Sequence, residues 1–221
     1  MIESTSSWNQ RATVGSDLQM NAPLFGLLLA GGKSSRMGCD KASVIFGGDG
    51  VTQAERAINL LGKLCQRTYL SLRAGQPTPK GGEGIPVLRD CDEAAGPMSG
   101  ILAALYEIPD AVWLVLACDL PFVTTDILVR LVARHREAPD APFIACSSSL
   151  DGLPEPLCAI YTPAALSLLR SYAGRAIFSP REIMLREGAP CLVLRGDEFH
   201  HLQNMNTPAD YDAARRIYCP S

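Results

Sequence analysis

The sequence predicts an α/β fold: a single Rossmann-like three-layer domain with a mainly parallel sheet and helices on both faces. Short, continuously apolar runs at residues 25–29 and 112–117 are typical of strands that are buried on both faces. Segments with apolar residues at helical spacing, such as residues 124–136, alternate with these runs. No internal repeat or linker divides the 221 residues, a length that suffices for one domain with a sizeable core.

The expected elements follow a polar N-terminal segment. Residues 1–23 lack the apolar stretch of a secretory signal, so we expect a disordered leader there and the domain over residues 24–221. The expected strands are residues 25–29, 68–72, 85–88, 112–117, 143–146, 157–161 and 191–194. The expected helices are residues 51–66, 98–106, 124–136, 164–172 and 181–187. A last helix is expected after Thr207, which would cap it ahead of Pro208.

The composition argues against several classes of protein. The net charge is −3 and the Lys and Arg residues are scattered, which argues against a nucleic-acid partner, because such binding needs clustered cations. No apolar stretch reaches the ~20 residues that a membrane span requires, so no membrane partner is expected. None of the eight cysteines forms a Cys-x-x-Cys pair, and no histidine stands at zinc-finger spacing from them. We therefore expect reduced thiols and a cytoplasmic protein.

A run rich in glycine, hydroxyl and cationic residues follows the first expected strand, from Leu29 to Lys41. Glycines allow the backbone to come close to a ligand, so that successive N–H groups can point at phosphate oxygens, and the serines and cations add donors and positive charge. The run therefore predicts a triphosphate-binding loop; the alternative is a glycine-containing turn with solvated charges. The phosphate-loop motif Gly-x-x-x-x-Gly-Lys-Ser/Thr is absent here. The motif Gly-x-Gly-x-x-Gly is also absent after this strand, which argues against a dinucleotide-dependent dehydrogenase. The residues of this run that would bind the triphosphate are Gly31, Gly32, Ser34, Ser35, Arg36 and Lys41.

A carboxylate follows the strongest strand signal, residues 112–117, in the run Cys118-Asp119-Leu-Pro121. Mg²⁺ in nucleotide enzymes takes one or two protein carboxylates together with substrate phosphates. Asp119 next to a triphosphate loop is therefore a candidate Mg²⁺ ligand; alone, it would be interpreted as an Asp that begins a turn before Pro121.

Four motifs in order resemble the molybdenum cofactor guanylyltransferase family, the molybdopterin nucleotidyltransferases. They are Leu29-Ala-Gly-Gly-x-Ser-x-Arg-Met-Gly-x-Asp-Lys41, then Asp90 with Gly96-Pro-Met-Ser-Gly-Ile101, then Ala117-Cys-Asp-Leu-Pro121, then Asn204-Met-Asn-Thr-Pro208. The match extends from about residue 24 to 217, nearly the whole chain after the leader. The resemblance implies an enzyme that transfers GMP from GTP to the terminal phosphate of molybdopterin and releases pyrophosphate, with Mg²⁺ as cofactor.

The resemblance also implies roles for individual residues. Arg36, Lys41 and Asp119 would be catalytic, and Asp119 would bind the metal. Transient contact with proteins that deliver or receive the cofactor would follow. The implied nucleotide-binding residues are Leu29, Ala30, Gly31, Gly32, Ser34, Lys41, Asp90, Gly96 and Asp119. The implied substrate-binding residues are Asn204, Asn206, Arg175 and Arg181, although the two arginines can also be interpreted as solvated helix ends and the asparagines as turn formers.

The chain departs from the family pattern after the second strand, where Arg73 follows in place of an Asn that helps to recognise the base. A CTP-dependent cytidylyltransferase or a sugar-phosphate nucleotidyltransferase therefore remains an alternative. A nucleotide-binding regulatory module without activity is a further alternative, which the complete set of Arg36, Lys41 and Asp119 argues against. Glu155 lies in a segment that resembles the substrate-side loop of the family, where it would face the pterin or belong to a proline-fixed surface turn.

Overall fold

The computed structural model describes residues 22–31, 41–46, 49–148, 151–205, 207 and 210. Its strands are β1 (Leu24–Leu29), β2 (Arg67–Leu72), β3 (Val87–Arg89), β4 (Val112–Ala117), β5 (Phe143–Ser148), β6 (Pro154–Tyr161) and β7 (Cys191–Leu194). Its α-helices are α2 (Gln53–Gly62), α3 (Pro97–Glu107), α4 (Thr125–Glu137), α5 (Ala164–Ala173) and α6 (Pro180–Arg186). Two 3-10 helices, Lys41–Ser43 and Gly196–Leu202, complete the described elements.

The strands form one sheet in the order β3-β2-β1-β4-β6-β5-β7. All neighbouring pairs are parallel except those that β6 makes with β4 and β5. The mainly parallel sheet expected from the sequence is therefore confirmed, with β6 as its one antiparallel strand among the described residues. Because β1, β2 and β4 are adjacent and parallel, their carboxyl ends meet at one edge, where ligands of such sheets bind.

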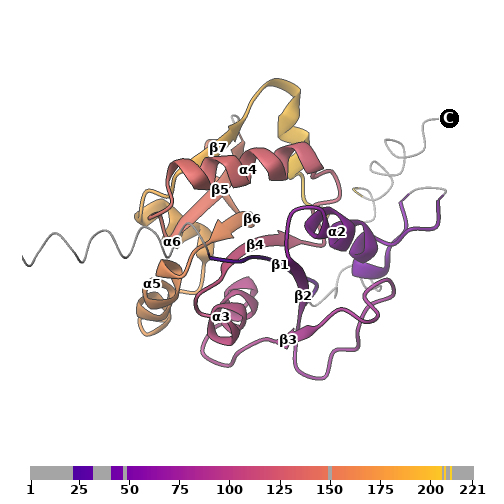
Figure 1. Cartoon of the computed structure of the whole chain (residues 1–221), viewed down its shortest axis with the longest axis horizontal. Coiled ribbons are helices and arrows are strands. Elements are labelled where there is room, and N and C mark those ends of the chain that lie inside the picture. The colour runs from indigo at the N-terminus through magenta and orange to yellow at the C-terminus, as the bar shows by residue number, and fades with distance from the viewer. Residues whose placement is uncertain are drawn as a thin grey trace, which may run out of the picture.

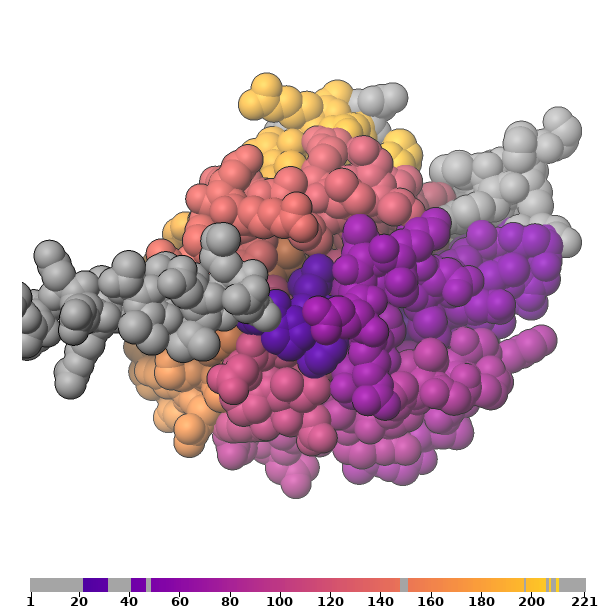
Figure 2. Space-filling view, in the orientation of Figure 1, coloured from indigo at the N-terminus to yellow at the C-terminus, as the bar shows by residue number. Residues whose placement is uncertain are grey.

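Helices cover both faces of the sheet, as Figure 1 shows with α2 and α4 on one side and α3 and α5 on the other. The strands divide their apolar side chains between the two faces, because successive residues of a strand point in opposite directions. Leu28 and Leu114 pack with α2 and α4, whereas Leu27 and Trp113 pack with α3, α5 and α6. In the space-filling view, the indigo segment that begins with β1 is surrounded by later parts of the chain (Figure 2).

Helices α2, α4 and α6 begin at a residue whose side chain caps the first turn. The Oγ1 atoms of Thr52 and Thr124 accept hydrogen bonds from the amides of Glu55 and Ile127, and so satisfy donors that the first helical turns leave unpaired. The described part of the last expected helix shows the same chemistry, since Asp210 donates from its amide to Thr207 Oγ1 at 3.2 Å. The rest of that helix lies outside the described residues.

Several boundaries and both 3-10 helices differ from the expectation. The strand expected from residue 157 begins at Pro154, so Glu155 lies within β6 and is buried rather than part of a surface turn. The helix expected over residues 51–66 ends at Gly62, because the amides of Leu64 and Cys65 fold back onto the Leu61 carbonyl and lead the chain into β2. The strand expected from residue 85 begins at Val87, since Pro86 has no N–H to donate to the sheet. The 3-10 helix Gly196–Leu202 was not expected, because its sequence carries no helical apolar period.

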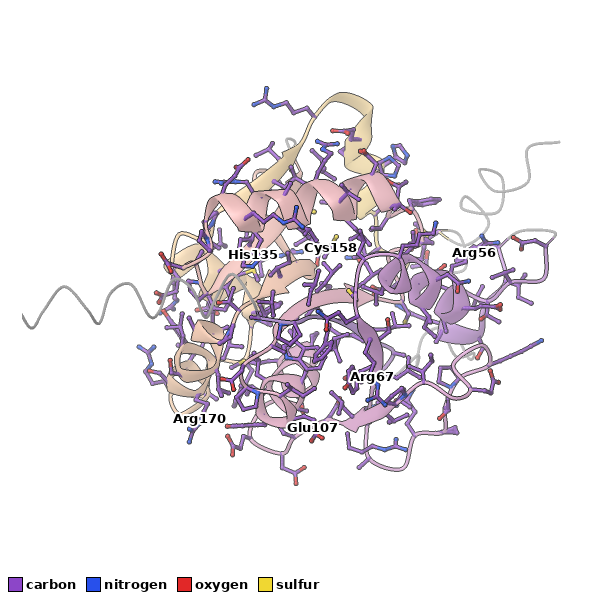
Figure 3. All side chains as sticks on the ribbon, in the orientation of Figure 1. Arg56, Arg67, Glu107, His135, Cys158 and Arg170 are labelled. Carbon is purple, nitrogen blue, oxygen red and sulfur yellow. The ribbon has the colours of Figure 1, made fainter. Side chains whose placement is uncertain are left out.

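The cysteines in the described residues are all free thiols, as their spacing predicts. Cys146 and Cys158 are fully buried in the layer between the sheet and α4, where Cys158 lies beneath that helix in Figure 3. They act there as small apolar side chains. No described helix is both long enough and apolar enough to cross a lipid bilayer.

Candidate functional site

A pocket opens at the carboxyl ends of β1, β2 and β4, between these strands and the start of α3. Its lining combines exposed backbone at Gly31, two carboxylates and the Lys41 ammonium. These groups are suited to a nucleotide and its metal counterion. The lining residues are Leu29, Ala30, Gly31, Lys41, Ser71, Asp90, Gly96, Pro97, Gly100, Ala117, Cys118, Asp119 and Leu157.

Asp119 and Lys41 form the charged centre of this pocket. The distance from Lys41 Nζ to Asp119 Oδ2 is 3.6 Å, and both side chains are about one-fifth exposed. Burial raises the pKa of the Asp119 carboxyl, and the Lys41 ammonium opposes that shift. The other carboxylate oxygen, Asp119 Oδ1, is buried and has no hydrogen-bond partner within the described residues. A buried oxygen without a donor is a position where a cation would be stabilised.

A segment distant in sequence reaches the same place. The amide of Met205 donates to the Asp119 carbonyl at 2.9 Å, and the Met205 side chain packs in a small cluster with Phe46 and Phe122. This contact brings Asn204 next to the Asp119 loop. Asn204 Oδ1 is a second buried oxygen for which the described residues offer no hydrogen-bond donor. Each of these oxygens is a candidate ligand for a hard cation.

Asp90 is oriented by β2. Ser71 Oγ donates to Asp90 Oδ1 at 2.8 Å, and the Asp90 amide continues the β2–β3 pairing by donating to the Leu72 carbonyl. Gly31 passes close by: a Cβ atom on it would stand 3.4 Å from Asp90 Oδ2 and from the Arg73 amide nitrogen. Gly31 and the Asp90 carboxylate therefore form one side of the pocket together.

Helix α3 presents its N-terminus to the pocket. Gly96 precedes the helix with a φ of 62°, a backbone conformation that glycine adopts without strain, and Pro97 occupies the first helical position. The unpaired amides of a first helical turn and the helix dipole favour an anion in front of it. The pocket therefore has two sources of positive potential, this helix end and the Lys41 ammonium.

At Gly100, α3 lies close to β1 and β2. A Cβ atom on Gly100 would stand 2.0 Å from Ser71 Oγ and 3.0 Å from Leu29 Cδ2. We expect Gly100→Ala to lower the free energy of unfolding by about 1–3 kcal/mol, because overpacking forces neighbouring groups to shift. Urea denaturation measures this value. Gly62→Ala is the matched control, since a Cβ at that helical position meets nothing within 4 Å; an equal loss in both variants would contradict the packing argument.

A second pocket adjoins the first and shares Gly96, Pro97 and Leu157 with it. Glu155 lies in this pocket with its side chain 7% exposed, and Arg181 reaches it from α6 with Nη2 2.7 Å from Glu155 Oε2. Arg181 Nε also donates to the Pro154 carbonyl at 3.0 Å. Burial raises the pKa of the Glu155 carboxyl, and the Leu157 amide and the Arg181 guanidinium oppose that shift. Asn204 lines the same pocket.

The structure brings most of the described candidate residues together. Arg175 is the exception, because its guanidinium lies over the Tyr172 ring, 4.2 Å from the centroid, and it lines neither of these two pockets. Ser71 and Gly100 were missed as candidates, although Gly100 belongs to a motif quoted for the resemblance. The candidates in the first pocket are Leu29, Ala30, Gly31, Lys41, Asp90, Gly96 and Asp119, and those in the second are Asn204 and Arg181. The candidates outside the described residues are Gly32, Ser34, Arg36 and Asn206.

Comparison with known proteins places this site in a family. The family model of the MobA-like NTP transferase domain matches residues 26–188. A molybdenum cofactor biosynthesis bifunctional protein of Synechocystis is 38% identical over 189 residues, which cover 86% of this chain and 53% of that protein. The chain thus spans about half the length of that relative. The probable molybdenum cofactor guanylyltransferase of Mycobacterium ulcerans is 35% identical over 141 residues, 62% of this chain and 67% of that protein.

A solved structure has the same fold. It is the molybdopterin-guanine dinucleotide biosynthesis protein A of Archaeoglobus fulgidus, with a TM-score of 0.70 and 23% identity, covering 87% of this chain and 97% of that one. The matched family region contains both the pocket at the strand ends and the Glu155–Arg181 pair. The chain therefore belongs to the MobA-like NTP transferase family and is similar to molybdenum cofactor guanylyltransferases.

Proposed function

We propose that this chain is a nucleotidyltransferase that transfers GMP from GTP to the terminal phosphate of molybdopterin or the molybdenum cofactor and releases pyrophosphate. The observation that carries the proposal is the Lys41–Asp119 pair, with its unpartnered carboxylate oxygen, in the pocket at the ends of β1 and β4. The names of the relatives, which are guanylyltransferases and molybdenum cofactor biosynthesis proteins, support the choice of GTP and of the acceptor.

The reaction requires charge neutralisation rather than a general base. An oxygen of the acceptor phosphate forms a bond to the α-phosphorus of GTP, the bond from that phosphorus to the β-phosphate bridging oxygen breaks, and pyrophosphate leaves with the electron pair. The attacking phosphate is already anionic, so no proton has to be removed. Lys41 and the N-terminus of α3 would stabilise the negative charge that builds up during the transfer, and the Arg36 of the sequence motif would add to it.

The residues of the site fit a divalent cation. Asp119 would bind Mg²⁺ through Oδ1, and Asn204 would supply a second oxygen from the adjoining loop. When bound, Mg²⁺ neutralises phosphate charge and orients the phosphates. Mg²⁺ in nucleotide sites usually takes one or two protein carboxylates, and substrate phosphates and water would supply its other ligands.

The two adjoining pockets would divide the substrates between them. Asp90 and Gly96 line the first pocket and would contact the base and ribose of the nucleotide, beside the loop that begins at Leu29 and would continue through Gly32 and Ser34. Arg181 and Asn204 line the second pocket and would face the anionic acceptor, with Asn206 of the same motif. Arg175 would contact the acceptor only after leaving the Tyr172 ring. Transient partners would deliver the acceptor and receive the product in the cytoplasm, without nucleic acid.

The proposal is tested by following pyrophosphate release from the purified chain with Mg²⁺ and each of GTP, CTP, ATP and UTP, with and without molybdopterin. We expect release that depends on both GTP and molybdopterin. Release with CTP alone among the nucleotides would contradict the guanine assignment. Pyrophosphate release with a sugar phosphate in place of molybdopterin would contradict the assignment of the acceptor. If none of the four nucleotides gave pyrophosphate release, a regulatory module without activity would be favoured.

Asn204→Ala should raise the Mg²⁺ concentration needed for half-maximal activity by at least about tenfold, because a ligand oxygen would be lost from the metal site. A magnesium titration of pyrophosphate release at saturating substrates measures this value. Gln203→Ala is the matched control, since Gln203 is the exposed neighbour of Asn204. An unchanged magnesium requirement in Asn204→Ala would exclude this residue from the metal site.

A further inference from the structure

Gln76 connects the turn after β2 to the start of the expected phosphate loop. Its Nε2 atom donates to the Ala30 carbonyl at 2.9 Å, and its Oε1 atom accepts from the Arg73 amide at 3.4 Å. The side chain is half-buried and comes from a residue that the motifs do not include. It is the contact through which this turn fixes the peptide between Ala30 and Gly31.

The direction of one amide follows from that contact. A trans peptide is planar, and its carbonyl and its N–H point in opposite directions. No described peptide is cis. Since the Ala30 carbonyl points toward Gln76, the N–H of Gly31 points away from Gln76. Gly31 is exposed and lines the pocket, and no acceptor for its N–H is found in the described part of the chain.

The residue before this peptide is also fixed. The Ala30 amide donates to the Ser71 carbonyl at 3.1 Å, so the backbone of Ala30 is hydrogen-bonded on both its N–H and its carbonyl side. The two partners come from β2 and from the turn that follows it. The Gly31 N–H is thereby held in one orientation before a ligand arrives, which lowers the entropy lost on binding.

The turn that carries Gln76 is itself braced. The Gln76 amide donates to the Arg73 carbonyl at 3.1 Å, and Gly75 adopts the positive φ of 72° that such a turn requires at its third position. Arg89 Nη1 donates to the carbonyls of both Arg73 and Gln76, at 2.9 and 2.7 Å. Arg89 thus fixes the turn without contacting the Ala30 carbonyl.

We propose that Gln76 is a positioning residue for the nucleotide: it fixes the Ala30–Gly31 peptide so that the Gly31 N–H is directed at the bound nucleoside triphosphate. The inference rests on the proposed function, because it assumes that the pocket binds a nucleotide. Gln76 itself does not line the pocket and acts through the backbone.

Gln76→Met tests the inference, because methionine has a similar length and cannot donate to the Ala30 carbonyl. We expect the dissociation constant of the nucleotide, measured by calorimetry, to rise about 3- to 10-fold, the usual effect of one hydrogen bond. The KM for GTP should rise with it, whereas kcat at saturating GTP should stay within about threefold. Gln66→Met is the control, since Gln66 is an exposed glutamine at the opposite end of β2.

A double-mutant cycle separates positioning from a general loosening of the turn. If Arg89 acts by fixing Gln76, Gln76→Met should have a smaller effect on the dissociation constant in an Arg89→Met background than in the wild type. Purely additive effects would contradict this part of the inference. A change in kcat with an unchanged KM would contradict the positioning role.

The outcome also distinguishes this inference from the proposed function. The dissociation constant is measured with whichever of GTP, CTP, ATP or UTP the wild-type chain binds. If none binds, the proposed function fails and the inference fails with it. If a nucleotide binds to the wild type, and folded Gln76→Met binds it within twofold of the wild-type constant, only the inference on Gln76 is wrong. Circular dichroism and the urea midpoint show whether the variant is folded.

Discussion

Asp119→Asn is expected to slow pyrophosphate release by about 10³-fold at saturating GTP and acceptor. Asparagine has the same size as aspartate but lacks the negative charge that would bind Mg²⁺ through the unpartnered Oδ1 and that pairs with Lys41. Steady-state assays over a range of Mg²⁺ concentrations measure the effect. Asp140→Asn is the matched control, because Asp140 is an exposed aspartate in the loop before β5. Full activity of Asp119→Asn would contradict the metal assignment.

The same variant should not destabilise the fold. Burial raises the pKa of the Asp119 carboxyl in the folded chain, so its protonated form is favoured there relative to the unfolded chain. The stability that this group contributes is therefore present at acidic pH and is lost as the pH rises through the raised pKa. At neutral pH the buried negative charge of Asp119 lowers the free energy of unfolding, and the neutral asparagine side chain removes this destabilising charge. We expect an unchanged or higher urea midpoint at pH 7; a large decrease would mean that activity was lost through unfolding.

Lys41→Met is expected to lower kcat by about 10²-fold or more. The Lys41 ammonium lies 3.6 Å from Asp119 Oδ2 and lines the pocket in which the triphosphate would bind. Methionine keeps most of the length of the side chain and removes its charge, so the transition state loses electrostatic stabilisation. Single-turnover measurements of pyrophosphate formation separate this effect from product release.

Lys80→Met provides the control for Lys41, since Lys80 is an exposed lysine in the loop between β2 and β3. Its activity should match the wild type. If Lys41→Met raised the KM for GTP and left kcat unchanged, Lys41 would stabilise the bound substrate and the transition state equally, and its specific catalytic role would be wrong.

The regular elements of the fold were predictable because local pattern determines them. The strands β1 and β4 are almost entirely apolar because helices cover both faces of the sheet. The bounds of β1, β2 and β4 were predicted within about one residue. The position of Asp119 beyond a strand also placed it correctly in the pocket, because the carboxyl ends of parallel strands meet.

Contacts between distant segments were not predictable from the sequence. Nothing local indicates that β6 runs antiparallel, since a strand has the same apolar pattern in either direction. The backbone bond from Met205 to Asp119, which brings Asn204 to the site, depends on packing against Phe46 and Phe122. The pairing of Arg181 with Glu155, the stacking of Arg175 on Tyr172 and the contact of Gln76 with Ala30 likewise depend on tertiary structure. Arg175 and Arg181 are only six residues apart in the sequence, but one stacks on an aromatic ring and the other pairs with a buried carboxylate.

The most direct test of the proposed reaction follows each phosphorus of GTP. Purified chain is incubated with Mg²⁺, molybdopterin and GTP that carries ³²P at either the α or the γ position, and the products are separated. Nucleotidyl transfer predicts that the α label appears in a molybdopterin dinucleotide and the γ label in pyrophosphate, in equal amounts. Transfer of the γ label to molybdopterin, or release of that label as inorganic phosphate with no labelled dinucleotide, would contradict the account.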